Sequence, residues 1–220
     1  MAVKIIICII VGYFCGTIST GYLMGRLHHI DIRNYGSGNA GATNAVRTLG
    51  KKAGFLVMVG DILKVVIPAV LVRYVIFRGE SYGPMLCEII GLAAVLGHNY
   101  PFWLKFKGGK GIASTAGAMV STDVRFFLFV PVFILIVAIT KYVSVGSLFV
   151  VVLYPVFLAI TWYGEPYYLP MILIACLFTV SGVFTHRANI KRLLNGTERK
   201  FGQKVVVTEE PKNEKQEGEA

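Results

Sequence analysis

The stretch Ala53–Phe77, AGFLVMVGDILKVVIPAVLVRYVIF, carries only three charged side chains, two of which, Asp61 and Lys64, lie near its middle. An α-helix needs about 20 predominantly apolar residues to cross the hydrocarbon layer of a membrane. The stretch is long enough and apolar enough to do so. It therefore predicts a transmembrane helix, and it decides how the rest of the chain is interpreted.

The remainder of the chain has the same character. The 220 residues are 55% hydrophobic and 15% charged, which is more apolar surface than one soluble core of this length buries. Further spans are predicted at Val3–Gly25, Pro84–Trp103, Arg125–Thr140, Val143–Tyr163 and Tyr167–Thr185, with a short segment of small residues at Gly111–Thr122. We therefore expect an all-α polytopic membrane protein with about seven transmembrane helices, one of them short.

Residues 1–206 are predicted to form one integral membrane domain. From residue 207 to 220 the chain is charged and poor in apolar residues, which is typical of a disordered polar tail. The four cysteines lie in apolar runs without a C-x-x-C pair, so neither a disulfide framework nor a zinc site is indicated.

Charges in the loops predict the orientation. The net charge of +10 is concentrated between the apolar runs, so it indicates membrane topology rather than a nucleic-acid partner. The basic loop residues that we assign to the cytoplasm are Arg26, Arg33, Arg47, Lys51, Lys52, Lys105, Lys107, Lys110 and Lys141. With seven crossings, the amino end lies outside and the carboxyl end lies in the cytoplasm.

A glycine-rich loop follows the first span. The segment GSGNAGATNAVR, Gly36–Arg47, contains G-x-G-x-x-G, but it follows a membrane helix and a polar linker rather than a strand, so the dinucleotide-binding interpretation fails. Likewise KFKGGKG lacks the G-K-[ST] ending of a phosphate-binding P-loop. What remains is a glycine-rich backbone able to direct N–H groups at an anion, with nearby arginine or lysine supplying charge.

The loops assigned to the cytoplasm combine positive charge with small or hydrogen-bonding residues. In HRANIKRLLNGTER, His186 and Asn189 share one helical face, and Asn195-Gly196 marks a helix end. Together the loops predict a cationic, hydrogen-bonding mouth for a substrate that carries phosphate. The alternative is that basic loops merely orient the protein and that the glycines serve helix packing.

Several polar residues keep two interpretations. Asp61 and Lys64 are spaced to form a pair within their span, or they contact substrate. His98 lies beside Tyr100 and Trp103, as interfacial residues do. Ser144 and Ser147 either bond a carbonyl one turn back or point into the mouth.

Three segments carry a resemblance to a known family. GSGNAGATNAVRTLGKKAG, GHNYPFWLKFKGGKGIAS and HRANIKRLLNGTERKFG resemble the three signature motifs of the PlsY family of bacterial membrane glycerol-3-phosphate acyltransferases. The resemblance extends to about Gly202. It implies transfer of a fatty acyl group from acyl phosphate to the sn-1 hydroxyl of glycerol 3-phosphate, giving lysophosphatidic acid and inorganic phosphate at the cytoplasmic face of the bacterial plasma membrane. The implied partners are these two substrates, the lipid bilayer and the enzyme that makes acyl phosphate.

The resemblance also implies site residues. Catalytic roles fall on Ser37, Arg47, His186 and Asn189. Substrate-binding roles fall on Gly38, Asn39, Gly41, Thr43, Asn44, His98, Lys107, Gly108, Gly109, Lys110 and Ser144. Ala188 departs from the family pattern, in which a larger polar residue is expected.

The chemistry of an acyl phosphate suits these residues. An acyl phosphate is a mixed anhydride with a good leaving group, so direct attack by the glycerol hydroxyl is expected, without a covalent acyl-enzyme. The chain holds no G-x-S-x-G elbow, which agrees with direct attack, and no H-x-x-x-x-D dyad, which argues against a thioester donor. It has no clustered carboxylates, so no metal is expected, and no other cofactor is expected. The proton acceptor is either His186 or a substrate phosphate oxygen.

Two rival functions remain at this stage. A transporter of a phosphorylated metabolite would place Asp61 and Lys64 on its path and would show an inverted repeat and a site near the middle of the membrane. A lipid-binding or scaffolding protein would explain the basic loops but not the matching motifs.

Overall fold

The computed structural model describes residues 1–203, and within this range all the regular secondary structure is helical. The α-helices are α1 (Ala2–Gly16), α2 (Thr20–Leu27), α3 (Ala42–Leu49), α4 (Lys51–Val70), α5 (Gly83–Asn99), α6 (Ile112–Thr122), α7 (Phe129–Thr140), α8 (Val143–Thr161), α9 (Tyr168–Thr185) and α10 (Arg187–Leu194). Short 3₁₀ segments occupy Ile32–Asn34, Phe102–Leu104 and Val124–Leu128. The predicted tail, 207–220, lies outside the described residues.

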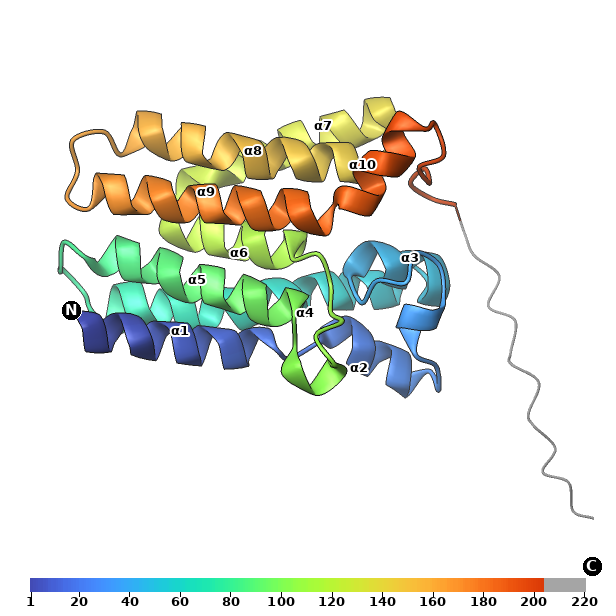
Figure 1. Ribbon diagram of the computed structural model, residues 1–220, viewed down its shortest axis with the longest axis horizontal. Helices are drawn as coiled ribbons and strands as arrows, with labels where there is room; N and C mark the ends of the chain where they lie inside the picture. The colour runs from blue at the N-terminus through green and yellow to red at the C-terminus, as the bar shows by residue number, and fades with distance from the viewer. Residues whose placement is uncertain (204–220) are drawn as a thin grey trace, which may run out of the picture.

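The long helices run side by side along one axis (Figure 1). Helices α1, α4 and α5 form one layer of the bundle, and α7, α8 and α9 form the other. The short α6 lies between the layers and packs against both α4 and α5. Small residues allow the closest of these contacts: a Cβ at Gly16 of α1 would overlap the backbone of Ala94 on α5.

Within the described residues 1–203, four helical runs are long and apolar enough to cross a membrane. They are Ala2–Leu27, Lys51–Ile76, Val143–Thr161 and Tyr168–Thr185. The run from Lys51 continues past Val70 through a π-helical turn, Leu71–Ile76, and so reaches almost the whole length predicted for Ala53–Phe77. Helices α5, α6 and α7 are shorter, with 17, 11 and 12 residues. The count of seven crossings and the orientation remain predictions.

The first predicted span, Val3–Gly25, lies within the candidate span Ala2–Leu27, but it is not a single continuous helix. The chain leaves the helical path between Gly16 and Thr20 and resumes as α2. The carbonyls released at this break accept hydrogen bonds from side chains: Trp103 Nε1 donates to Thr17 at 3.0 Å, and Lys64 Nζ donates to Ile18 at 2.8 Å. Because these side chains come from other elements, the apolar pattern of the span alone could not predict the break.

One cluster of buried apolar residues lies between α4, α5, α6, α8 and α9. Its centre is a group of aromatic rings in which Tyr154 meets Phe126 and Phe178 edge to face, with centroids 5.2 and 5.5 Å apart. Helix α7 contributes no fully buried residue, so it lies at the outside of the bundle. All four cysteines are free thiols. Cys8 and Cys87 are buried, but Cys15 is partly exposed and Cys176 is exposed on the apolar surface of α9, so the apolar runs do not bury all four.

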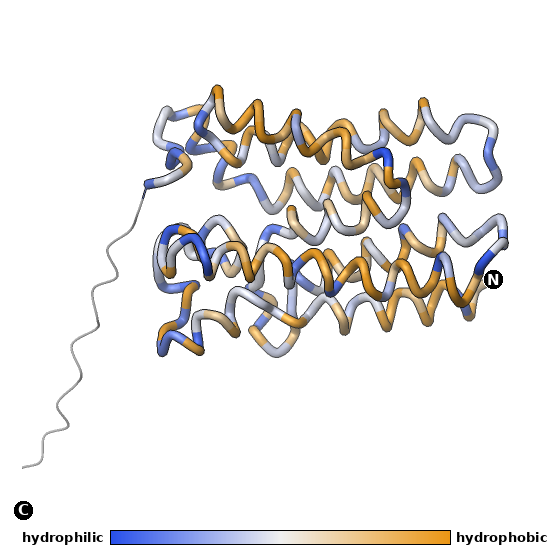
Figure 2. Tube along the Cα trace, turned by 180° about the vertical axis from the view of Figure 1, so that it is seen from behind, coloured by the Kyte–Doolittle hydropathy of each residue, from blue (hydrophilic) through white to orange (hydrophobic). Residues whose placement is uncertain are grey.

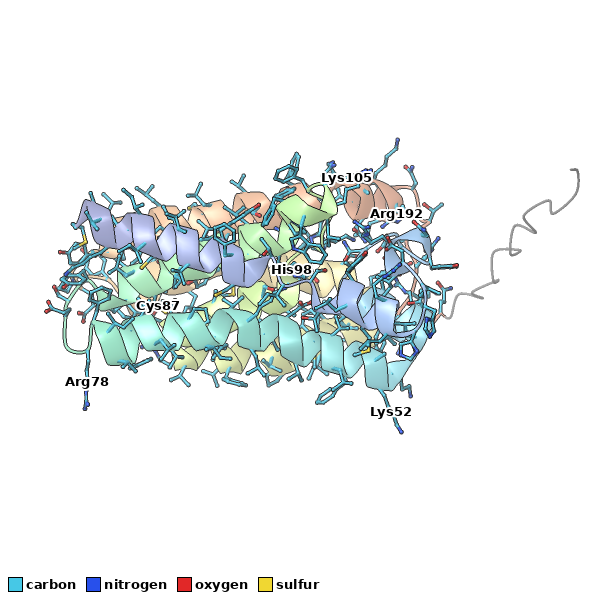
Figure 3. All side chains as sticks on the ribbon, turned by 90° about the horizontal axis from the view of Figure 1, so that it is seen from below. Lys52, Arg78, Cys87, His98, Lys105 and Arg192 are labelled. Atoms are coloured by element: carbon cyan, nitrogen blue, oxygen red, sulfur yellow. The ribbon has the colours of Figure 1, made fainter. Side chains whose placement is uncertain are left out.

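Polar segments gather at the two ends of the bundle, and most lie at the end that holds α2, α3 and α10 (Figure 2). Figure 3 places Lys52, Lys105 and Arg192 at this end and Arg78 at the opposite one. The fold therefore brings together the basic loops that the sequence analysis assigned to one side of the membrane.

Candidate active site

The glycine loop is organised by one buried asparagine. The Asn44 amide, at the start of α3, donates through Nδ2 to the carbonyls of Ile32 and Tyr35, at 3.0 and 3.1 Å. Its Oδ1 accepts from the backbone N–H and the hydroxyl of Ser37, at 2.8 and 3.2 Å. The amide is thus used within the protein, so Asn44 shapes the loop. This differs from the substrate-binding role that the sequence led us to expect.

Arg47 lies one turn further along α3 and reaches the space beside this loop. Its Nη2 lies 3.4 Å from the carbonyl of Arg199, and its Nε is a buried donor without a protein partner in the described structure. Burial lowers the pKa of the guanidinium, which nonetheless stays charged at neutral pH. Arg47 therefore presents a charged donor that is free to bind an anion.

Lys110 approaches the same region from the segment that precedes α6. Its ammonium group donates to Asn189 Oδ1 on α10, which joins the second and third sequence motifs directly. Burial, and then the positive charge of Arg192, lower the pKa of Lys110 to about 8. Lys110 is thus a cation at neutral pH, and it loses its charge as the pH rises above about 8.

Glu198 connects Ser144, Asn189 and Arg192. Its Oε1 accepts from Ser144 Oγ at 3.0 Å and from Asn189 Nδ2 at 2.6 Å, while Oε2 pairs with Arg192 Nε at 2.7 Å. Although burial raises the pKa of this carboxyl group, the hydrogen bonds from Asn189, Arg192 and Ser144 outweigh it and hold the pKa below its ordinary value. Glu198 is therefore an ionised acceptor that orders three polar side chains.

Some of these groups line a pocket of about 110 Å³. Its lining residues are Gly36, Ser37, Arg47, Arg192, Glu198 and Arg199. Arg199 also donates to the carbonyl of Gly36, so the segment after α10 crosses to the glycine loop. Three arginines against one carboxylate give the pocket the positive charge that the sequence analysis predicted for a phosphate-binding mouth.

His186 lies at the junction of α9 and α10. Its Nδ1 is 2.8 Å from the carbonyl of Gly182, which can only accept, so Nδ1 carries the proton and Nε2 is the acceptor. Burial and the positive charge of Lys110 lower the pKa of His186 to about 4. The ring is therefore neutral at physiological pH.

The backbone of the glycine segments differs from expectation. The N–H groups of Gly38 and Gly41 are donated to Tyr35 and to the Asn39 side chain, and those of Gly108 and Gly109 to the carbonyls of Asn99 and His98. Because these N–H groups are used inside the protein, the positive charge for an anion comes from side chains. Gly108 and Gly109 instead permit close packing against His98, and Gly38 has a positive φ that favours glycine.

Several predicted site residues lie elsewhere. Lys107 and Gly38 line a second pocket, of about 440 Å³, on the other side of the glycine loop. Thr43 is partly exposed on the first turn of α3. His98 is 3% exposed and contacts Asp61 and Lys64 inside the bundle, so neither the interfacial position nor a position in the mouth holds for it.

The serines of α8 divide between the two interpretations. Ser144 points to Glu198 at the site, whereas Ser147 donates to the carbonyl of Val143 at 2.9 Å. The helix end predicted at Asn195-Gly196 is confirmed, since α10 ends at Leu194.

The sequence analysis missed Glu198 and Arg199. Both lie in NGTERK, directly after the predicted helix end, where a charged turn is usually solvated. The signal that could have found them is the pairing of Glu198 with the positive charge of Arg192, six residues earlier on α10. Within residues 1–203 no group of three or more His, Cys, Asp or Glu residues is placed to hold a metal ion.

Comparison with known proteins shows to which family the chain belongs. A family profile described as glycerol-3-phosphate acyltransferase matches residues 6–196. The chain belongs to the glycerol-3-phosphate acyltransferase family. The resemblance to PlsY is thereby confirmed, and the protein is an acyltransferase rather than a transporter or scaffold.

Relatives of this family cover almost the whole chain. The glycerol-3-phosphate acyltransferase of Clostridioides difficile strain 630 is 45% identical over 202 residues, which is 90% of this chain and 96% of that protein. The enzyme of Thermoanaerobacter sp. strain X514 is 41% identical over 200 residues, with the same two shares.

Two solved structures show the same fold. The crystal structure of PlsY, an integral membrane glycerol 3-phosphate acyltransferase, in its glycerol 3-phosphate form has a TM-score of 0.80 at 36% identity. The lysophosphatidic acid form has a TM-score of 0.78 at 35% identity. Each match covers 90% of this chain and 96% of the other. An all-α, integral membrane acyltransferase fold is therefore confirmed.

Proposed function

We propose that this acyltransferase uses acyl phosphate as its donor and acylates the sn-1 hydroxyl of glycerol 3-phosphate. The observation that carries the proposal is the small cationic pocket in which Arg47, Arg192 and Arg199 lie beside Ser37, with Lys110 bound to the neighbouring Asn189. Both substrates present a compact phosphate, for which arginine and lysine are suitable donors. The glycerol 3-phosphate and lysophosphatidic acid forms of PlsY support the assignment of acceptor and product.

In the proposed reaction the glycerol hydroxyl oxygen attacks the acyl carbonyl carbon, and the bond from that carbon to the phosphate oxygen breaks. The carbonyl oxygen becomes negatively charged in the transition state, and the leaving group is inorganic phosphate. Arg47 has a free Nε donor for one of these charges, and Lys110 supplies a second cation. Such preorganised donors are the main source of rate enhancement in acyl transfer.

The hydroxyl proton passes to a substrate phosphate oxygen in this proposal. The pKa of His186, lowered to about 4, makes its imidazole a weak base at neutral pH, whereas a phosphate monoester has a second pKa near 6. We assign His186 and Asn189 to orienting the bound substrates. Of the two alternatives for the proton acceptor, the low pKa of His186 favours the substrate phosphate.

We further propose that the site faces the cytoplasm of a bacterial plasma membrane. The basic residues gather at the end of the bundle that holds the pocket, as the positive-inside rule requires of a cytoplasmic end. An acyl chain then lies in the bilayer while its phosphate reaches the polar end.

The deciding experiment supplies purified protein with acyl phosphate and labelled glycerol 3-phosphate, without CoA, ATP or added metal. We expect lysophosphatidic acid acylated at the sn-1 position and one inorganic phosphate per turnover. A parallel reaction with acyl-CoA should give little or no product. Comparable turnover with acyl-CoA, or no product from acyl phosphate in folded protein, would refute the donor assignment.

A further inference from the structure

Three ionisable side chains meet inside the bundle, away from the pocket. Lys64 Nζ lies 2.8 Å from Asp61 Oδ1 and 2.7 Å from His98 Nδ1, and the three residues are 8%, 1% and 3% exposed. Figure 3 shows His98 within the bundle, between its two ends. Charged groups in a membrane protein interior are costly unless they are paired, so a function for this cluster is expected.

The cluster also holds the break between α1 and α2. Lys64 Nζ donates to the carbonyl of Ile18 at 2.8 Å, and Thr20 Oγ1 donates to Asp61 Oδ1 at 3.1 Å. The three protons of the Lys64 ammonium group thus have three acceptors, on α4, on α5 and in the break. Because Lys64 bonds α4, α5 and the break at once, it ties these three segments together, and the side chains of the cluster cannot move independently.

One side of the cluster supports the segment that carries Lys110. The carbonyl of His98 accepts from Gly109 N–H at 3.1 Å, and that of Asn99 accepts from Gly108 N–H at 3.1 Å. The His98 ring lies so close to Gly109 that a Cβ at this position would overlap its Nε2. Gly108 and Gly109 therefore rest directly on the end of α5, and the next residue is Lys110.

We infer that Asp61, Lys64 and His98 are positioning residues, which hold Gly108 and Gly109 against α5 and thereby fix Lys110 beside Asn189. The inference rests on the site proposed above, because Lys110 is the group that the cluster places. The role of Asp61 and Lys64 then differs from both earlier interpretations, which were pairing within the span and contact with substrate. The cluster acts through the backbone, since its side chains are buried away from the pocket lining.

Amide hydrogen exchange tests the inference without relying on activity. In detergent-solubilised protein, Asp61→Asn should accelerate exchange at Gly108 and Gly109 at least about tenfold, because the support for their hydrogen bonds loosens. Amides in α9 should exchange at the wild-type rate. The matched control is Glu88→Gln, which alters a buried carboxyl group on α5 that bonds Tyr154 and has no contact with Gly108 or Gly109. It should leave exchange at both glycines unchanged.

A size-exchange cycle tests the contact itself. Gly109→Ala should raise the KM for glycerol 3-phosphate by about tenfold or more, because its methyl group pushes Lys110 out of place, while kcat changes less. The double variant His98→Ala with Gly109→Ala opens space for the methyl group. Its KM should therefore be lower than that of Gly109→Ala alone. If the two substitutions acted independently, the double variant would instead be more impaired than either single variant.

Two results would overturn the inference. One is faster exchange spread evenly over α9 as well as Gly108 and Gly109 in Asp61→Asn, which would make the cluster a general stabiliser. The other is a double variant as impaired as the sum of its single variants. Wild-type protein that lacks activity with acyl phosphate, while the exchange result holds, would refute the proposed donor and leave the positioning role standing.

Discussion

Arg47 and Lys110 show how burial sets the chemistry of a single side chain. Both are cationic and both approach the pocket, but the guanidinium stays charged on burial whereas the ammonium group loses part of its basicity. Glu198 balances them and orders Asn189 and Arg192. The roles of the two cations are therefore tested differently. A change in side-chain geometry tests Arg47, and the pH dependence of substrate binding tests Lys110.

Arg47→Lys should fold normally and lose most of its activity. The planar guanidinium offers two parallel hydrogen bonds and a free Nε, which a lysine ammonium group cannot reproduce. Loss of a donor aimed at developing charge costs about 3 kcal/mol, or roughly a hundredfold in kcat/KM. Steady-state kinetics with both substrates measures this.

The controls for Arg47 are Lys51→Arg and Lys52→Arg, at the exposed start of α4. Each should change turnover by less than about threefold, because exposed charges contribute little. Near-normal turnover and substrate affinity in Arg47→Lys would mean that Arg47 is only a cytoplasmic anchor.

The affinity for glycerol 3-phosphate should fall as the pH rises through about 8. Lys110 binds an anion only when protonated, and its pKa of about 8 lies below the ordinary value for lysine. Below this pH the charge is present, and above it the charge is lost, so KM should rise on the alkaline side. The pH dependence of KM measures this. In Lys110→Arg, which stays charged, the rise should disappear; a rise that persists there would assign it to another group.

At the scale of elements, the site depends on places where helices stop. The break between α1 and α2 brings α2 toward the site end, and the short α3 carries both Asn44 and Arg47. The turn at His186 redirects α9 into α10 and brings Asn189 to Lys110. Each stop frees backbone carbonyls that other elements must satisfy.

Trp103→Phe should destabilise the protein by about 1 kcal/mol, because the carbonyl of Thr17 loses the donor that lies 3.0 Å away. Thermal unfolding in detergent measures the change. The control is Phe102→Leu, which alters a neighbouring exposed ring that donates no hydrogen bond and should have a smaller effect. Equal effects of the two variants would mean that the bond to Thr17 does not stabilise the break.

At the scale of the whole molecule, the bundle has one end that carries the site and most of the hydrophilic segments, and an opposite end with fewer of them (Figure 2). At the latter, Arg125 and Asp123 form an ion pair at 2.6 Å, so their charges compensate. The asymmetry between the two ends is what predicts the orientation.

Single cysteines introduced in a background free of the four native cysteines should reveal this orientation. Cysteines at Asn34, Lys105 and Gln203 should react only with reagents that reach the cytoplasm, and cysteines at Glu80 and Glu165 should react from outside. Labelling of intact cells and of inverted vesicles with an impermeant maleimide measures this. Reaction of Lys105→Cys from outside would contradict a cytoplasmic site.

The sequence by itself determined the fold class, the family and the chemical character of the site. Apolar runs of sufficient length require helices in a membrane, because hydrocarbon leaves no other partner for the backbone. The positions of the basic loops followed from the same runs, and the fold does bring Arg47, Lys110 and Asn189 close together.

Only the tertiary structure decided which polar residues meet. The sequence does not distinguish Asn44 and His98 from residues that bind a ligand. In the structure, Asn44 bonds the glycine loop and His98 contacts Lys64 beside Asp61. The break at Thr17–Ser19 and the role of Glu198 likewise depend on partners far away in the chain. The physical reason is that a hydrogen-bonding side chain takes the nearest available partner, and the packing of the helices alone determines which partner that is.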